Sequence, residues 1–215
     1  MRVAYEQRAR QDLNLETRAG DLGQFAGDTT AACFWLSLAA GLAYARWEVP
    51  SQALPALVDA PALLREVRQL SVSDLDHRTT SLSLRVSPVG QLALLLRRYM
   101  CQAPGAALLR RSSVQMIFPA FAALDSQSDR RQLHHYKSWV NKLASKEYAD
   151  ELVVLATAQA LHVEIVCVPY TPESAMAPWV ISTYKPRGGE QHPRVLLGNN
   201  DVHYMWLSSQ APRPR

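Results

Sequence analysis

The chain has 215 residues, of which 48% are hydrophobic and 20% are charged, and its formal net charge is +4 at pH 7. This composition is typical of a folded globular protein and excludes an intrinsically disordered chain. The basic residues are scattered and form no dense block, so the sequence argues against a nucleic-acid-binding protein.

Helical spacing dominates the first half of the chain. Residues 33–43 follow the polar turn "GDTT" (27–30) and repeat apolar side chains at intervals of three and four, which predicts a helix that Thr29 or Thr30 caps. The next helix is expected to open at Pro61, because proline is favoured in the first turn. The same spacing predicts this helix over residues 61–70 and three more, at 90–100, 133–143 and 148–161.

After Leu161 the helical spacing gives way to short β-branched runs bounded by proline, glycine and asparagine. These runs predict strands near residues 163–168, 178–184, 194–199 and 203–208, the last two joined by the tight turn "GNND". Helices followed by closely spaced strands indicate an α+β domain with a small, mostly antiparallel sheet. No linker is evident, so we expect a single domain over residues 1–215, with a frayed tail at 209–215.

Three cysteines, Cys33, Cys101 and Cys167, lie far apart and form neither a CxxC pair nor a cluster with zinc spacing. We therefore expect no disulfide framework and no metal site. The longest apolar stretch, residues 31–45, is too short and too interrupted to cross a bilayer, and the polar first twenty residues lack a signal-peptide pattern. A soluble protein in a reducing compartment is the expectation.

Cys33 stands where the polar turn meets an apolar run, "CFWLSLAAGL". A thiol in the first turn of a helix lies beside backbone N–H groups that favour the thiolate and can hold an oxyanion. Composition alone nevertheless favours a buried core cysteine, since free cysteines are usually buried. Cys101, at the end of an apolar helix, and Cys167, inside a strand, are expected to be inert core residues.

A cysteine nucleophile needs a histidine within hydrogen-bond reach to take its proton. The chain has six histidines, and His203 is distinct because it opens a predicted strand directly after a Gly/Asn/Asp turn and precedes Tyr204. A lone histidine in a strand is more often structural than catalytic. The residues alone therefore leave both roles open for His203.

Three segments, taken in order, resemble the ovarian-tumour (OTU) family of papain-like cysteine proteases. They are "CFWLSLAAGL" (33–42), "DELVVLATAQALHVEIVCV" (150–168) and "GNNDVHYMWL" (198–207). In the family, the corresponding segments are the nucleophile helix, an acidic-leucine helix followed by a strand, and the strand that opens with the general base. The resemblance implies a papain-like OTU fold, with a helical first half packed on the C-terminal sheet, Cys33 as the nucleophile and His203 as the base.

The resemblance also implies a division of the domain. The nucleophile helix lies near residues 30–45, and residues 146–208 hold the acidic-leucine helix and the strands with His203. Residues 46–145 match no family segment in detail, and we expect substrate-binding elements there from their position between the two matched parts.

The turn before the cysteine departs from the family pattern. The family usually has aspartate and then glycine at the third and second positions before the cysteine, which here are Thr30 and Ala31. The nearest Gly-Asp pair, Gly27 and Asp28, lies further upstream. We therefore expect the oxyanion turn to differ in shape from that of the family.

The third catalytic member is a second departure. Many family members place an orienting Asp or Asn two residues after the histidine, and that position here is Met205, which cannot orient an imidazole. We expect Asp28 to take this role, and the turn before His203 supplies the alternatives Asn199, Asn200 and Asp201. A Cys–His dyad without a third member is also possible.

The function implied by the resemblance is that of a deubiquitinase. It would hydrolyse the amide at the C-terminal glycine of ubiquitin or a ubiquitin-like protein through a thioester, with ubiquitin or its chains as partner and without a cofactor. Two alternatives are a catalytically impaired OTU-like fold that binds a protein, and a cysteine protease or acyltransferase that acts on another protein. Richness in Ala, Leu and Arg fits a GC-rich bacterial genome, where such a protein would be an effector acting in the host cytoplasm.

Overall fold

The structure, a computed structural model, describes residues 15–17, 31–70, 83–102, 138, 140–144, 149–169, 181–186, 191–199 and 204–209. The helices in these ranges are α2 (Cys33–Tyr44), α3 (Ala60–Gln69), α5 (Ser83–Val86), α6 (Pro88–Cys101) and α9 (Glu151–Leu161). The strands are β1 (Leu15–Thr17), β2 (Glu164–Pro169), β3 (Ser182–Tyr184), β4 (Arg194–Asn199) and β5 (Tyr204–Ser209). The expected α+β class is confirmed.

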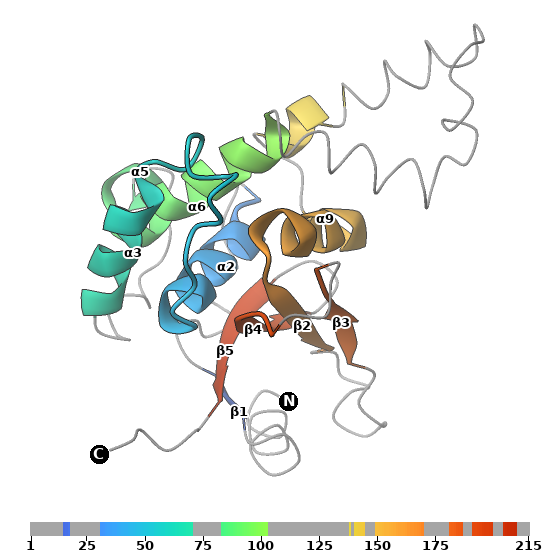
Figure 1. The fold of residues 1–215 in the computed structure, drawn as a ribbon. Coiled ribbons are helices and arrows are strands. Elements are labelled where there is room, and N and C mark those ends of the chain that lie inside the picture. Colours follow the sequence, from blue (N-terminus) through green and yellow to red (C-terminus); the bar gives the residue numbers. More distant parts are fainter. Residues whose placement is uncertain are drawn as a thin grey trace, which may run out of the picture.

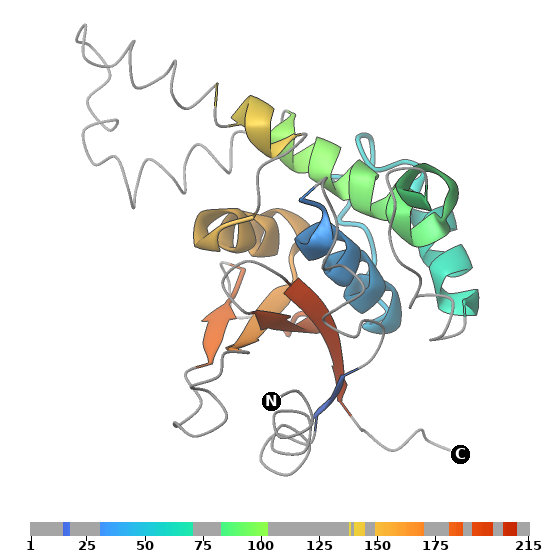
Figure 2. The same ribbon diagram turned by 180° about the vertical axis from the view of Figure 1, so that it is seen from behind.

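The helices are stacked in two layers above one sheet. Figures 1 and 2 show α2 and α9 lying against the sheet, with α3 and α6 on the side of α2 that faces away from it. Eleven of the twelve residues of α2, Cys33 to Ala43, are consequently buried. A helix that is apolar on all sides is buried on all sides, and α2 is the central element of the core.

Local signals in the sequence set the ends of three helices. A proline lies in the first turn of both α3 and α6. Proline has no N–H donor, but the N–H groups of a first turn make no hydrogen bond within the helix, so none is lost. The Ser87 hydroxyl caps α6 by accepting from the Gly90 N–H at 3.1 Å, and the Asp150 carboxylate caps α9 by accepting from the Val153 N–H at 3.0 Å. The helices predicted at 61–70, 90–100 and 148–161 are thus confirmed. Of the helix predicted at 133–143, only residues 138 and 140–143 are described, and they are helical.

The predicted cap of the first helix is wrong. The N-cap residue of α2 is Ala32, whose methyl side chain cannot accept a capping hydrogen bond. The backbone turns into the helix at Ala31, whose φ of 52° lies in the left-handed region, so the helix begins after the two threonines rather than beside them.

The sheet is mixed, with the strand order β1-β5-β4-β2-β3. Three of the four strand pairings in the described residues are antiparallel, as expected, but the central pair of β2 and β4 is parallel over six residues. After β2 the chain turns back into β3, which pairs with one edge of β2 in the antiparallel direction. The chain then reverses again into β4, which pairs with the other edge of β2 and so runs parallel to it. The sequence did not predict β1, a three-residue strand that pairs with the far end of β5.

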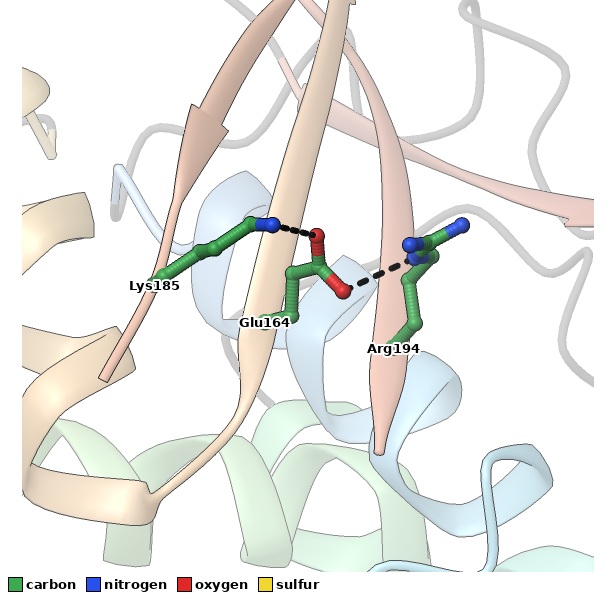
Figure 3. Close-up of polar contacts among 3 residues, drawn as sticks. All are labelled: Glu164, Lys185 and Arg194. Atoms are coloured by element: carbon green, nitrogen blue, oxygen red, sulfur yellow. Dashed lines mark hydrogen bonds and ion pairs between the residues drawn. The ribbon is translucent and has the colours of Figure 1, made fainter. Parts of the chain in front are cut away.

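At one end of the sheet, the carboxylate of Glu164 forms two ion pairs. Glu164 of β2 lies directly opposite Arg194 of β4 in the parallel register. Its carboxylate receives the Arg194 Nε–H at 2.9 Å and contacts the Lys185 ammonium, just beyond β3, at 3.4 Å (Figure 3). The two ion pairs link three neighbouring strands.

The helix layer approaches the sheet closely at Gly41 of α2. A Cβ at this position would overlap Cγ1 of Val195 on β4 and would lie 3.2 Å from the Trp206 ring on β5. Glycine at this point therefore sets the spacing between α2 and the sheet. None of the helices in the described ranges has the length and apolar character that a membrane span needs.

Candidate functional site

Cys33 is the first residue of α2, at the boundary that the sequence predicts for a nucleophile. The first hydrogen bond of the helix joins the Leu36 N–H to the Ala32 carbonyl at 2.9 Å. The N–H groups of the first turn have no acceptor within the helix and form the positive end of its dipole. This is the environment that a thiolate or an oxyanion needs.

The Cys33 side chain is also part of the core. Cys33 is 1% exposed, and Ala31 and Ala32 beside it are 2% and 1% exposed. Cys33 therefore lies at the first turn of a helix, as a nucleophile would, and is also packed among apolar side chains, as a core cysteine would be. A substrate carbonyl can reach the thiol only if its neighbours move.

The turn before Cys33 contains an unusual backbone conformation. Ala31 has a φ of 52°, in the left-handed region, where a Cβ crowds the following carbonyl and costs about 1–2 kcal/mol. This is the position that is usually glycine in the family pattern, and glycine enters the left-handed region without that cost. The backbone of Ala31 therefore adopts a conformation that is typical of glycine, although the residue is alanine. Residues 27–30 lie outside the described residues, so the expected difference in the rest of the turn stays a prediction.

Tyr204, the first residue of β5, packs against the first two turns of α2. Its ring lies 5.1 Å from the ring of Phe34 in an edge-to-face arrangement. Its backbone carbonyl accepts a buried hydrogen bond from the Ser37 hydroxyl at 3.1 Å. One ring contact and one hydrogen bond thus fix the start of β5 beside the start of α2.

Tyr204 lies within electrostatic reach of several other ionisable side chains. Burial raises the pKa of Tyr204 far above that of an exposed tyrosine, and the neighbouring groups Cys167, Tyr184, Cys33 and Asp150 raise it further whenever they are ionised. The phenol therefore stays neutral and keeps its proton at all physiological pH values. Together these groups form a cluster of side chains from α2, β2, β3, β5 and the start of α9.

Asp150 is the acidic member of this cluster that the sequence did not identify as a site residue. Burial raises the pKa of its carboxyl, although the hydrogen bond from the Val153 N–H opposes that effect. An aspartate directly before a helical run is the ordinary signature of an N-cap. That signature indicates a helix start and nothing more, and the closeness of Asp150 to Tyr204 depends on contacts far apart in the chain.

The residues predicted for the remaining catalytic roles fall mostly beyond the described part of the chain. His203, Asp28, Asn200 and Asp201 all lie outside the described residues, and their roles stay predictions. Asn199 is described: it ends β4 and is paired with Tyr204 in the antiparallel register of β4 and β5. Asn199 is the one of the four candidates for the third member that lies within the described residues, and it lies beside the start of β5.

The other two cysteines have the properties of core thiols. Burial raises the pKa of Cys167, inside β2, to about 12, and the charge of Glu151 adds to the effect. Burial raises the pKa of Cys101, at the end of α6, to about 11, although the positive charge of Arg97 opposes it. Both thiols are therefore protonated at neutral pH.

No protein-family model matches the chain, and no curated protein has a significantly similar sequence. Among the described residues, no three histidine, cysteine or acidic side chains are grouped so that they could hold a metal ion. What the site can do therefore follows from the helix start at Cys33 and its contacts with the start of β5.

Proposed function

We propose that the protein is a cysteine-dependent deubiquitinase with an OTU-like fold, in which Cys33 is the nucleophile and His203 the general base. The observation that supports this most strongly is the contact between the first turns of α2 and Tyr204. His203 directly precedes Tyr204, and neighbouring Cα atoms in a chain are about 3.8 Å apart. We therefore propose that His203 acts from this end of β5 on the thiol at the start of α2.

The reaction would proceed through a thioester. His203 takes the proton of the Cys33 thiol, and the thiolate attacks the carbonyl of the C-terminal glycine of ubiquitin or a ubiquitin-like protein. Backbone N–H groups at the start of α2 stabilise the tetrahedral oxyanion. His203 then protonates the departing amine, and the thioester remains. Water, deprotonated by His203, hydrolyses the thioester, which releases the carboxylate and restores the thiol without a cofactor.

The third catalytic member in this proposal is Asp28, with Asn199 as the alternative supported by its pairing with Tyr204. Its task is to hold the imidazole in the tautomer that can accept the thiol proton. The neutral phenol of Tyr204 can donate a hydrogen bond but cannot accept the catalytic proton. We propose a reducing cytoplasm as the place of action, including that of a host cell reached by secretion.

The direct test is a ubiquitin probe with an electrophile at its C-terminus. The wild-type protein is expected to form a covalent adduct, detected by intact-mass measurement, and Cys33→Ala is expected to lose it. Cys101→Ala is the matched control and should react like the wild type. An adduct that persists in Cys33→Ala would exclude Cys33 as the nucleophile, and diubiquitin cleavage by His203→Ala at the wild-type rate would exclude His203 as the base.

One observation favours a second function, that of a catalytically impaired OTU-like protein that binds a partner. Cys33 is only 1% exposed, and the family's Asp-Gly pair is replaced by Thr30 and Ala31. Binding of ubiquitin without adduct formation would support this second function. Failure to bind ubiquitin, together with cleavage of a different protein through Cys33, would instead identify a protease or acyltransferase with another substrate.

A further inference from the structure

A cavity of about 960 Å³ lies in the helical part of the molecule, between α3, α5, α6 and residues 141–144. Neither Cys33 nor Tyr204 lines it, so this cavity is separate from the candidate catalytic site. Its volume is in the range of pockets that hold small organic ligands. Nothing in the proposed hydrolysis uses it.

The wall of the cavity is positively charged. Three arginines line it, Arg85 from α5 and Arg97 and Arg98 from α6. Among the described residues in the wall, Asp59 is the one acidic side chain. The excess of positive charge around a partly enclosed space favours an anionic occupant, because field lines concentrate in such a cleft.

Arg97 supplies a fixed part of this charge. It is 2% exposed, and its Nε–H donates a hydrogen bond of 2.6 Å to the carbonyl of Leu143. A guanidinium does not lose its proton in a protein, so the charge stays in the wall at every pH. Arg85 and Arg98 are exposed and have long, flexible stems, which allows their planar groups to turn toward an anion.

The same wall has an apolar part. Leu94 and Leu95 of α6 line the cavity together with Leu63 of α3. Leu94, Arg98 and Cys101 follow one another at helical intervals of four and three, so apolar and cationic side chains share one face of α6. An inorganic anion would leave the leucines in water, and a neutral apolar molecule would bring no charge to the arginines.

We propose that this cavity binds a small organic anion, whose phosphate or carboxylate group is held by Arg85 and Arg98 next to the fixed charge of Arg97, and whose apolar body lies against Leu94 and Leu95. Arginine presents parallel N–H donors that match either group in a bidentate arrangement. The site would allow an amphiphilic metabolite or a modified side chain of such chemistry to bind the helical part of the molecule.

Calorimetric titration of the full chain with 1-naphthyl phosphate and 1-naphthylacetate tests the proposal. At least one of these probes is expected to bind more tightly than inorganic phosphate, which lacks the apolar body, and 1-naphthol, which lacks the charge. The tighter of the two identifies the preferred head group. If neither probe binds more tightly than both single-feature controls, the proposal is wrong.

Charge-removing variants locate the binding. Arg85→Gln and Arg98→Gln change exposed positions, so both variants are expected to fold. Each should lower the affinity for the probe about tenfold through loss of a charge-assisted hydrogen bond. Arg65→Gln is the matched control, since Arg65 is an exposed arginine of α3 that does not line this cavity. Equal weakening by the control and by Arg98→Gln would place binding elsewhere and overturn the proposal.

A chemical readout in the cavity wall is independent of calorimetry. Cys101 lines the cavity, and in a Cys33→Ala background its alkylation by N-ethylmaleimide at alkaline pH can be followed by mass spectrometry. The bound probe is expected to slow the alkylation of Cys101 and to leave that of Cys167 unchanged. An unchanged rate at Cys101 under saturating probe would contradict binding in this cavity.

Discussion

The Ser37 hydroxyl donates a buried hydrogen bond of 3.1 Å to the carbonyl of Tyr204, across 167 positions of sequence. Ser37 lies one helical turn after Cys33, and Tyr204 directly follows His203 in the chain. This single bond therefore ties the helix that carries the proposed nucleophile to the strand that follows the proposed base. Its loss should change both the stability of the fold and the geometry of the site.

Ser37→Ala is expected to lower the free energy of unfolding by about 1 kcal/mol, the usual contribution of a buried hydrogen bond. Urea denaturation measures this loss, and Ser51→Ala, at an exposed position, is the control that should leave stability unchanged. With diubiquitin as substrate, kcat should fall while KM stays near the wild-type value, because the contact positions the reacting groups and does not hold ubiquitin. Wild-type kcat in a destabilised Ser37→Ala protein would show that the bond serves the fold alone.

Ala31→Gly tests the left-handed turn before Cys33. Removing the Cβ relieves about 1–2 kcal/mol of strain, and the greater freedom of glycine in the unfolded chain offsets about 0.5–1 kcal/mol of that gain. A net stabilisation of roughly 0.5–1 kcal/mol is expected in urea denaturation. Ala39→Gly, in the buried middle of α2, should instead destabilise by about 1 kcal/mol or more. Similar losses for both variants would contradict the strained turn.

Elements with a local signal were predictable from the sequence. Pro61 near the start of α3 and Asp150 at the start of α9 mark helix starts by the chemistry of their own backbone or side chain. The start of α2 near Cys33 was also predictable, because a polar turn meets an apolar run there. The left-handed conformation of Ala31 was not, since alanine carries no preference for that region and only the packing of the chain imposes it.

Relationships between distant segments were not predictable in the same way. β4 runs parallel to β2 because it pairs with β2 and not with β3, and that choice of partner depends on contacts between distant segments. The three residues of β1 are too few to show alternation, and they gain their strand conformation by pairing with β5. The bond between Ser37 and Tyr204 likewise has no sequence pattern, because a serine inside an apolar helix looks the same whether or not a carbonyl lies opposite it.

Gly41→Ala is expected to destabilise the fold by about 1–3 kcal/mol, the usual cost of overpacking a core. The added methyl group overlaps Cγ1 of Val195, a short β-branched side chain that cannot swing away. Thermal denaturation should show a lower midpoint. The double variant Gly41→Ala/Val195→Ala should lose less stability than the sum of its two single variants, since the overlapping group is gone. Additive losses would mean that the new methyl group is accommodated elsewhere.

The Glu164 ion pairs predict a pH-dependent contribution to stability (Figure 3). Burial acts to raise the pKa of Glu164, but the hydrogen bond and charge of Arg194 and the charge of Lys185 outweigh it, so the pKa lies below its ordinary value. The folded state thus binds this proton less readily than the unfolded chain does. The stabilisation is therefore present above the ordinary pKa of a glutamate and is lost as the pH falls through the lowered value.

Glu164→Gln should accordingly lower the free energy of unfolding by about 0.5–1 kcal/mol at neutral pH, a modest amount because the Lys185 and Arg194 side chains are largely exposed and screened. The difference from the wild type should shrink with added salt and vanish once the pH lies below the lowered pKa of Glu164, where the carboxyl is protonated in both states. Urea denaturation over this pH range is the measurement, and Glu66→Gln on the exposed face of α3 is the control. A difference that stays constant as the pH falls through the acidic range would mean that Glu164 stabilises the sheet by packing, since a contribution from its charge must disappear when the carboxylate is protonated.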